Sequence, residues 1–310
     1  MRVAFIEKKF KPQSLVLIDQ INEIMAEYEE DGYDLSLRQL YYALVSRDIV
    51  PNNFRSYKSV GNLVNDARMA GLLDWDTIVD RGRETKALNH WSSPSEILEA
   101  VAEQFRIDKW LNQPNYVEVM VEKDALSGVV GRVCNRLDVS YTANKGYSSQ
   151  SFMYRKGVEL QRVARRKSVH VLYLGDHDPS GLDMDRDIEE RLGIFSRGAR
   201  IRVVRLALTM DQVEEHNPPP NFAKSTDVRA RGPNGYISRF GEDSWELDAL
   251  EPRVLDRVIT TEVERLRDQN IWDADCARQQ HMRDDLQRMA DEYYYEEPED
   301  DDGDDEDDEE

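Results

Sequence analysis

Cysteine and long apolar runs are scarce in this sequence, and each absence excludes a class of protein. The two cysteines among the 310 residues, Cys134 and Cys276, fit neither the ligand spacing of a zinc site nor a disulfide framework. No run of about 18 apolar residues occurs, so we expect no transmembrane helix and no membrane partner. The N-terminal stretch MRVAFIEKKFKPQ has too short an apolar segment for a secretory signal. A cytoplasmic protein is therefore expected.

Negative charge is concentrated at one end of the chain. Residues 296–310, EEPEDDDGDDEDDEE, contain 13 acidic side chains and no basic one, and without them the net charge falls from −21 to −8. Such a segment has no apolar surface to bury, so the sequence predicts a disordered acidic C-terminal tail. The tail would either increase solubility or mimic nucleic acid and compete for a basic groove of the same chain. The rest of the chain is long enough for one large or two ordinary domains.

Residues 1–92 have the pattern of a small helical domain. Apolar side chains recur every three or four positions from Ser14 to Tyr28, and Ser36 is placed to cap a second helix. A third helix is expected from Tyr57 to Met69, closed by Gly71. The sequence WDTIVDRGRET then predicts a short strand and a basic turn. This outline is typical of a winged helix-turn-helix whose third helix enters the major groove of DNA, although a helical bundle packed on the next domain would share it.

Residues 115–208 alternate apolar strands with helices. Strands are expected at 115–122, 139–146, 168–176 and 199–208. Repeated units of this length predict an α/β fold, with a parallel sheet flanked by helices and ligands beyond the carboxyl ends of the strands. The predicted organisation is an α-rich domain at 1–92, a connecting helix at 93–114, a sheet domain with a C-terminal extension at 115–275, a C-terminal helix at 276–295 and the tail.

Three acidic side chains are expected at one edge of this sheet. Glu122 ends the first strand, and Asp176 and Asp178 follow the third within GDHDPSG. Carboxylates that meet in this way repel each other, which raises their pKa values unless a cation is present. Because such hard oxygen ligands suit Mg²⁺, the pattern predicts a magnesium site made of these three residues. The alternative is that Asp178, which precedes Pro179, only caps the next helix.

Several motifs resemble one family of proteins. VEVMVEKDAL and YLGDHDPSG resemble the Toprim domain of the topoisomerase VI A subunit and of the related meiotic double-strand-break protein. NKGYSS resembles the glycine turn of that family, and SWELDAL at 244–250 resembles a C-terminal helix motif. SLRQLYYALV resembles its Arg-x-x-Tyr-Tyr segment. The resemblance covers roughly residues 15–270 and implies a winged-helix domain followed by a Toprim-type parallel sheet.

The resemblance also implies a DNA-cleaving enzyme like a type IIB topoisomerase. In the family, the second tyrosine of the pair attacks a DNA phosphodiester, forms a 5′-phosphotyrosyl link and frees a 3′-hydroxyl; here that residue is Tyr42. Tyr41 belongs to the apolar stripe of its helix, whereas Tyr42, about 100° further round, is expected to face away from it. Arg38 lies one turn earlier on the same face, where its guanidinium would hold the phosphate and favour the phenolate. The alternative for Tyr42 is an aromatic residue that packs on the neighbouring domain.

Partners follow from the same resemblance. Family members are dimers on double-stranded DNA in which each tyrosine meets the acidic cluster of the other subunit, so a monomer would be inactive in cleavage. Because the sequence contains no Walker P-loop, strand passage would need a separate ATPase subunit of the B type. Contacts with the DNA backbone are expected from basic residues of the first domain, some of which would be ordinary surface charges: Arg55, Lys58, Arg68, Arg81, Arg83 and Lys86.

Two other functions fit the same residues. One is a Toprim nuclease that uses a metal-activated water and leaves Tyr42 idle. The other is a DNA-binding module without catalysis, acting as the partner of an ATPase subunit. Lys123 and Lys145 adjoin the expected site, and His177 would contact phosphate or turn into the sheet. Residues 216–241 are expected to form a long loop near the DNA or a subunit contact; its basic residues are Lys224, Arg229, Arg231 and Arg239.

Overall fold

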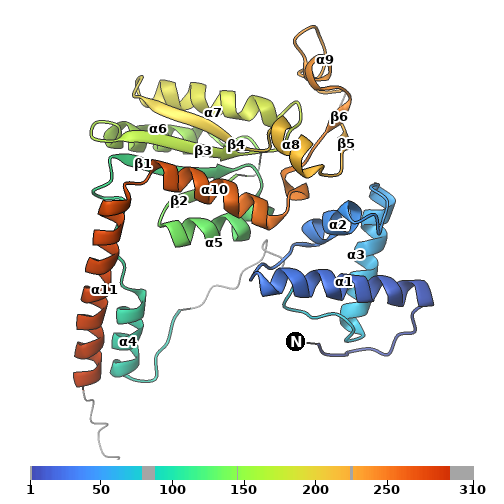
Figure 1. Cartoon of the computed structure of the whole chain (residues 1–310), viewed down its shortest axis with the longest axis horizontal. Helices are drawn as coiled ribbons and strands as arrows, with labels where there is room; N and C mark the ends of the chain where they lie inside the picture. The colour runs from blue at the N-terminus through green and yellow to red at the C-terminus, as the bar shows by residue number, and fades with distance from the viewer. Residues whose placement is uncertain (1, 79–87, 145, 224–225, 294–310) are drawn as a thin grey trace, which may run out of the picture. The chain divides into compact units, whose positions relative to one another are not determined.

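The computed structural model describes residues 2–78, 88–144, 146–223 and 226–293 (Figure 1). The chain divides into two compact units. Residues 1–84 and 112–268 form the first, and residues 85–111 and 269–310 form the second. The predicted α-rich domain and the predicted sheet domain therefore belong to one unit. The acidic tail at 296–310 lies outside the described residues.

Three helices open the first unit, as the periodicity predicts. They are α1 (Pro12–Glu30), α2 (Leu37–Ser46) and α3 (Phe54–Met69). Ser36 caps α2 as expected, and its side chain accepts a hydrogen bond from the backbone of Gln39 while the Gln39 side chain accepts one in return. After α3 the chain turns at Gly71, whose φ of +72° lies in the left-handed region that favours glycine.

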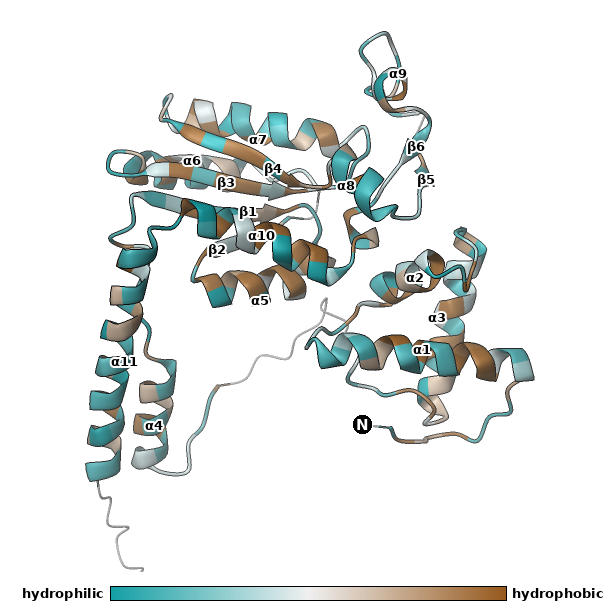
Figure 2. Cartoon of the chain, in the orientation of Figure 1, coloured by the Kyte–Doolittle hydropathy of each residue, from teal (hydrophilic) through white to brown (hydrophobic). Residues whose placement is uncertain are grey.

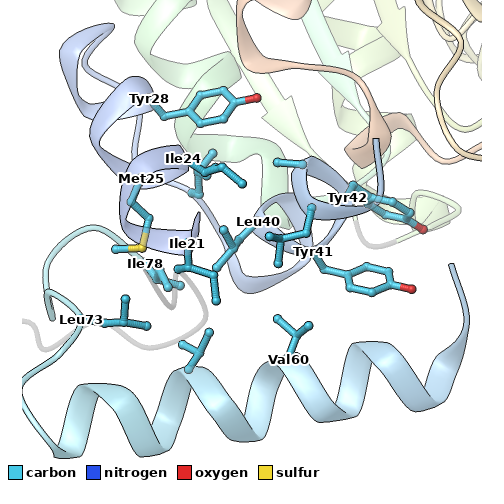
Figure 3. Close-up of a cluster of buried hydrophobic side chains, with 14 of the residues drawn as sticks. Ile21, Ile24, Met25, Tyr28, Leu40, Tyr41, Tyr42, Val60, Leu73 and Ile78 are labelled. Carbon is cyan, nitrogen blue, oxygen red and sulfur yellow. The ribbon is translucent and has the colours of Figure 1, made fainter. Parts of the chain in front are cut away.

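Apolar side chains from these helices meet in one core (Figure 3). Ile21, Leu40 and Val60, one from each helix, are at most 2% exposed. Full burial of a side chain of this size stabilises the fold by about 1.5–3 kcal/mol. Ile78 joins this core and pairs with Leu35 in a single β-bridge, without a strand in residues 70–78. The remainder of the expected strand and basic turn, at 79–87, lies outside the described residues, so the wing stays a prediction.

A four-stranded parallel sheet forms the centre of the rest of this unit. Its strands are β1 (Asn115–Val121), β2 (Ser140–Ala143), β3 (Ser168–Leu174) and β4 (Ile201–Ala207), in the order β2-β1-β3-β4. The predicted α/β class and all four strands are confirmed. β1 and β3 are apolar along most of their length because each is buried on both faces, as central strands of a parallel sheet are.

Helices cover both faces of this sheet (Figure 1). α6 (Gln150–Val163) and α7 (Gly181–Phe195) lie on one face, and α5 (Ser127–Leu137), preceded by the 3₁₀ turn η1 (Asp124–Leu126), lies on the other with α10 (Pro252–Leu266). Hydrophobic residues are concentrated on the strands, and hydrophilic residues are more frequent on the surrounding helices (Figure 2). Met153 of α6 and Ile188 of α7 pack with Val171 of β3 in the core of the first face.

Short elements connect β4 to α10. They are α8 (Met210–His216), β5 (Asn221–Phe222), α9 (Tyr236–Phe240), β6 (Asp243–Ser244) and the 3₁₀ turn η2 (Leu247–Ala249). β5 and β6 pair in an antiparallel two-stranded sheet. The segment 216–241 thus contains a strand and a helix where a loop was expected. SWELDAL, which resembles a helix motif, lies on β6 and η2.

The second unit pairs two helices. α4 (Pro94–Gln104) is capped by Ser93 as predicted but ends well before residue 114, and α11 (Gln269–Glu292) begins seven residues earlier than predicted. The Trp110 and Trp272 rings meet edge to face at 6.3 Å, and Arg283 donates to the backbone carbonyl of Phe105.

No helix in the described part of the chain is long and apolar enough to cross a membrane.

The two thiols differ in burial, which gives a test of the fold. Cys134 of α5 is fully buried, and burial raises the pKa of its thiol to about 12, whereas Cys276 of α11 is partly exposed. At about pH 8, a thiol reagent should modify one cysteine per native chain and both after denaturation. The Cys276→Ser variant should then show no fast reaction. Fast modification of both thiols in the native protein would contradict the described core.

Candidate functional site

Two of the predicted acidic residues meet at the carboxyl edge of the sheet. Glu122 directly follows β1, and Gly175 alone separates Asp176 from the end of β3. Neither acid is more than 8% exposed. The backbone N–H of Asp176 donates to Glu122 Oε2 at 2.8 Å. These residues come together because β1 and β3 are adjacent parallel strands that end at the same edge.

The charges of this edge are poorly compensated. Burial, followed by the negative charge of Asp176, raises the pKa of Glu122 to about 7. Burial also raises the pKa of Asp176, although the ammonium of Lys123 opposes this shift. Both carboxyl groups therefore sit where an added positive charge would stabilise their ionised forms.

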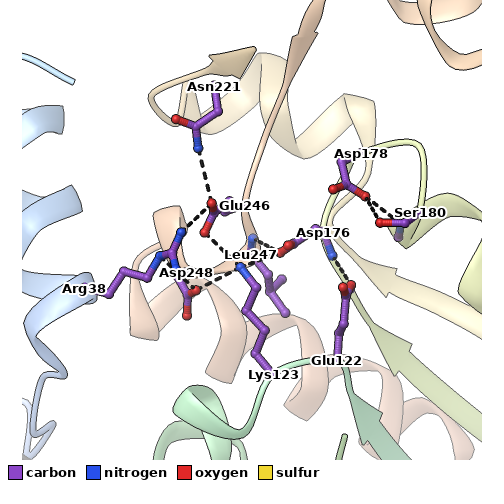
Figure 4. A network of polar contacts seen from close by, with 12 residues as sticks. Arg38, Glu122, Lys123, Asp176, Asp178, Ser180, Asn221, Glu246, Leu247 and Asp248 are labelled. Atoms are coloured by element: carbon purple, nitrogen blue, oxygen red, sulfur yellow. Dashed lines mark hydrogen bonds and ion pairs between the residues drawn. The ribbon is translucent and has the colours of Figure 1, made fainter. Parts of the chain in front are cut away.

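Lys123 supplies a cation to this edge (Figure 4). Its Nζ lies 3.0 Å from Asp176 Oδ1, 2.9 Å from Glu246 Oε2 and 2.9 Å from Asp248 Oδ2. Burial disfavours the ammonium, but Asp248, Asp176 and Glu246 together outweigh it and raise the pKa of Lys123. The ammonium thus joins the sheet edge to η2.

Asp178 is engaged differently from the other two acids. Its Oδ1 accepts from Ser180 Oγ at 3.0 Å and from the backbone N–H of Gly181 at 2.6 Å, at the start of α7. This is the capping contact that the alternative predicts. Gly181 is required in this turn because a Cβ there would lie 2.2 Å from the backbone oxygen of Asp176.

Arg205 of β4 holds the loop that carries these aspartates. Its guanidinium donates to the backbone oxygens of Gly175, at 3.2 Å, and Asp176, at 3.3 Å, and its Nε pairs with Asp185 at 3.0 Å. The signal available for this role was an arginine among the apolar residues of β4, although Arg202 lies in the same strand. Sequence reasoning missed it because the partners are backbone oxygens, which no motif records.

The donor chemistry of the edge fits Mg²⁺, but one oxygen of each of its three carboxylates already accepts a hydrogen bond. Among the described residues, no three acidic, histidine or cysteine side chains surround one point as metal ligands would. Lys123 and backbone N–H groups contact the oxygens of Glu122 and Asp176 that an ion would take. The raised pKa of Glu122 and the hard carboxylate donors are what a divalent cation would stabilise.

Both tyrosines of the pair are buried. Tyr41 is 4% exposed, as its place in the apolar stripe predicts, and its hydroxyl accepts from the backbone N–H of Asn53 at 2.8 Å. Tyr42, which was expected to face away from the apolar stripe, is also 4% exposed and belongs to the same core, because the side of α2 that carries it is covered as well. Its ring packs on Tyr41, with centroids 5.5 Å apart, and its hydroxyl accepts from Asn221 Nδ2 at 3.0 Å.

The surroundings of Tyr42 favour its neutral phenol over the phenolate. Burial, followed by the negative charge of Glu246, raises the pKa of Tyr42, and the opposing effects of Asn221 and Arg38 are smaller. The guanidinium of Arg38 also lies 2.5 Å from Glu246 Oε1 and 3.7 Å from Asp248 Oδ2. Arg38 lowers the pKa of Tyr42, as predicted, but burial and Glu246 outweigh this effect.

One cavity of about 430 Å³ borders both halves of the site. Its lining includes Arg38, Tyr42, Asp176, Asp178, Asn221 and Glu246. The tyrosine and the aspartates thus face the same cavity within a single chain. The meeting of one subunit's tyrosine with the acids of the other, which the resemblance implies, stays a prediction.

The predicted DNA contacts on α3 fall into two groups. Arg55 and Lys58 are exposed, as a DNA contact requires. Arg68 is partly buried and donates to the backbone oxygens of Asp74, Trp75 and Ile78, so its guanidinium stabilises the turn after α3, and its contact with DNA stays a prediction. Arg81, Arg83 and Lys86 lie outside the described residues.

Two of the remaining basic candidates, His177 and Arg229, have partners within the chain. His177 is 2% exposed among aromatic rings, its Nδ1 lies 2.9 Å from the Tyr236 hydroxyl, and burial lowers its pKa to about 4, so it is not placed to contact phosphate. Arg229 pairs with Asp183 at 3.1 Å. Arg231 and Arg239 are exposed. Lys145 and Lys224 lie outside the described residues.

Besides Arg205, three residues of the site were not predicted from the sequence: Asn221, Glu246 and Asp248. Glu246 and Asp248 belong to SWELDAL, which carried a family resemblance without a role for either acid. Their contacts with Lys123 span more than 120 residues of sequence. The chain was compared with protein-family models and with curated proteins, and neither comparison gave a match.

Replacing Lys123 tests whether its ammonium holds the site together. The Lys123→Met variant keeps most of the side-chain volume but takes the cation from buried Asp176 and leaves Glu246 and Asp248 to Arg38, so we expect a loss of about 3–5 kcal/mol in the free energy of unfolding. Urea denaturation measures it. The control is Lys8→Met, which removes the more exposed Lys8–Asp66 pair and should cost less than about 1 kcal/mol. Equal losses in the two variants would contradict the role of Lys123.

Proposed function

We propose that this chain cleaves double-stranded DNA by attack of Tyr42 on a phosphodiester, in the manner of the topoisomerase VI A subunit. The observation that carries the proposal is the cavity lined by Tyr42, Arg38, Asp176 and Asp178. A nucleophilic hydroxyl, a guanidinium suited to phosphate and acidic residues suited to a cation share that cavity. The motif order of the sequence supports the same proposal.

In the proposed step, Tyr42 Oη forms a bond to phosphorus while the bond from phosphorus to the 3′-oxygen breaks. The phenol gives up its proton, and the leaving 3′-oxygen takes one, which yields a 5′-phosphotyrosyl link and a free 3′-hydroxyl. Because the phenol is protonated in the arrangement described, the incoming phosphate must first release Arg38 from Glu246. The freed guanidinium then binds the phosphate oxygens and offsets the effect of Glu246 on Tyr42.

The acidic edge serves the phosphate in this proposal. Mg²⁺ bound by Glu122, Asp176 and Asp178 would neutralise negative charge on the phosphate. Lys123 keeps Asp176 oriented, and Arg205 fixes the loop. Strand passage would need a separate ATPase subunit, and a homodimer remains part of the proposal.

A second candidate is a Toprim nuclease in which a metal-activated water attacks the phosphate. The burial of Tyr42 and the raised pKa of its phenol favour this alternative, because both oppose a tyrosine nucleophile. The two reactions differ in what remains attached to the DNA.

The proposal predicts a covalent link between protein and DNA. After incubation with Mg²⁺ and duplex labelled at its 3′ ends, a denaturing gel should show protein-bound label for the wild type. Tyr42→Phe should abolish it, because this change removes the nucleophilic oxygen and keeps the ring. Tyr41→Phe is the matched control and should retain the adduct.

Other patterns on the same gel would contradict the tyrosine mechanism. Free DNA ends that persist in Tyr42→Phe and vanish in Glu122→Gln would identify the metal-dependent nuclease. Duplex binding without cleavage in the presence of Mg²⁺ would leave a DNA-binding module without catalysis.

A further inference from the structure

Two phenylalanines at the cavity are unusually exposed. Phe54 is 71% exposed and Phe222 is 87% exposed, and both line the cavity that contains Tyr42 and Arg38. Exposed single apolar residues are common on proteins, but two aromatic rings at the border of one polar cavity form a distinct feature. We call these two rings the aromatic rim.

The aromatic rim is supported by ordered backbone. Phe54 is the first residue of α3, directly after Asn53, whose side chain caps that helix. Phe222 lies in β5, where it pairs with Asp243 of β6. The side chain of Asn52 joins the two segments, since its Nδ2 donates to the backbone oxygen of Pro220 at 2.6 Å. Both rings therefore extend from segments that are tied to each other.

The charges nearby indicate what the rim would contact. Lys58 places its ammonium 4.7 Å from the centroid of the Phe54 ring, and Arg38 lies within the cavity. An occupant that stacks on a ring and also meets these cations needs a flat apolar face joined to an anionic group. A nucleotide has both. A protein partner fits less well, because the centres of protein interfaces are depleted in lysine.

We propose that Phe54 and Phe222 stack on a nucleobase next to the phosphate that enters the cavity, so that the site takes DNA with a locally unstacked or unpaired base. This inference rests on DNA being the substrate, as in the proposed function. Stacking on an aromatic side chain tolerates any base sequence, because every base has a π-face. The aromatic rim therefore selects the shape of the DNA at the reacting phosphate and not its sequence.

Fluorescence anisotropy with two single strands of equal length tests the inference. One is a short oligothymidylate, and the other carries abasic residues in place of its central bases, so that the phosphates are equal in number. The wild type should bind the complete strand about tenfold more tightly. The double variant Phe54→Ala with Phe222→Ala should lose that preference while its affinity for the abasic strand stays unchanged. The control Phe5→Ala removes a phenylalanine that is 63% exposed and outside this cavity, and should keep the preference.

The outcomes separate this inference from the proposed function. Equal affinity of the wild type for the two strands, or an intact preference in the double variant, overturns the stacking role and leaves DNA cleavage standing. Absence of binding to any strand or duplex overturns both. Sedimentation velocity adds one more outcome: a double variant that changes its oligomeric state but keeps its base preference would assign the rim to contact with a second copy of the chain.

Discussion

The candidate site depends on the ion pairs between the ammonium group of Lys123 and three carboxylates. Asp176, Glu246 and Asp248 each place an oxygen within 3.0 Å of it, and all four side chains are largely removed from water. In such surroundings an unpaired charge costs free energy, so removing either the ammonium or a carboxylate would destabilise the fold. Lys123 follows β1, Asp176 lies in the loop after β3, and Glu246 and Asp248 lie at η2. Their ion pairs therefore hold three distant segments of the chain around one point.

Glu246 extends this pairing to the other half of the site. Its Oε2 pairs with Lys123 and its Oε1 with Arg38 (Figure 4). Asn221 Nδ2 lies 3.5 Å from Glu246 Oε1 and donates to the hydroxyl of Tyr42 at 3.0 Å. The resting arrangement is therefore one in which a carboxylate holds the guanidinium that a phosphate would need, and the phenol keeps its proton. Binding of a phosphate would exchange one anion for another at Arg38. In the proposed function, this exchange couples the arrival of DNA to the activation of Tyr42.

The sequence predicted most of the fold because the relevant patterns are local. The periodicity of α1 to α3, the cap at Ser36 and the four apolar strands all depend on residues a few positions apart. The meeting of Glu122 and Asp176 was predictable because parallel strands end at a common edge. The orientation of Tyr42 was not, because α2 is covered on more than one side: every residue from Gln39 to Val45 is buried, and Ala249 of η2 packs against the helical core. A single apolar stripe could not reveal a second covered face. The partners of Lys123 were likewise set by tertiary contacts, whereas those of Arg68 are nearby backbone oxygens, which no side-chain pattern records.

The central claim is that Tyr42, Arg38 and the acidic edge act on one phosphate in one cavity. Diffraction from a crystal grown with a short DNA duplex and Mn²⁺, whose anomalous signal locates the ion, tests it most directly. We expect an anomalous peak about 2.1 Å from carboxylate oxygens of the Glu122 and Asp176 pair, with a DNA phosphate between that ion and the guanidinium of Arg38, facing the Tyr42 hydroxyl. A duplex bound elsewhere on the chain, with neither ion nor phosphate in the cavity, would contradict the claim.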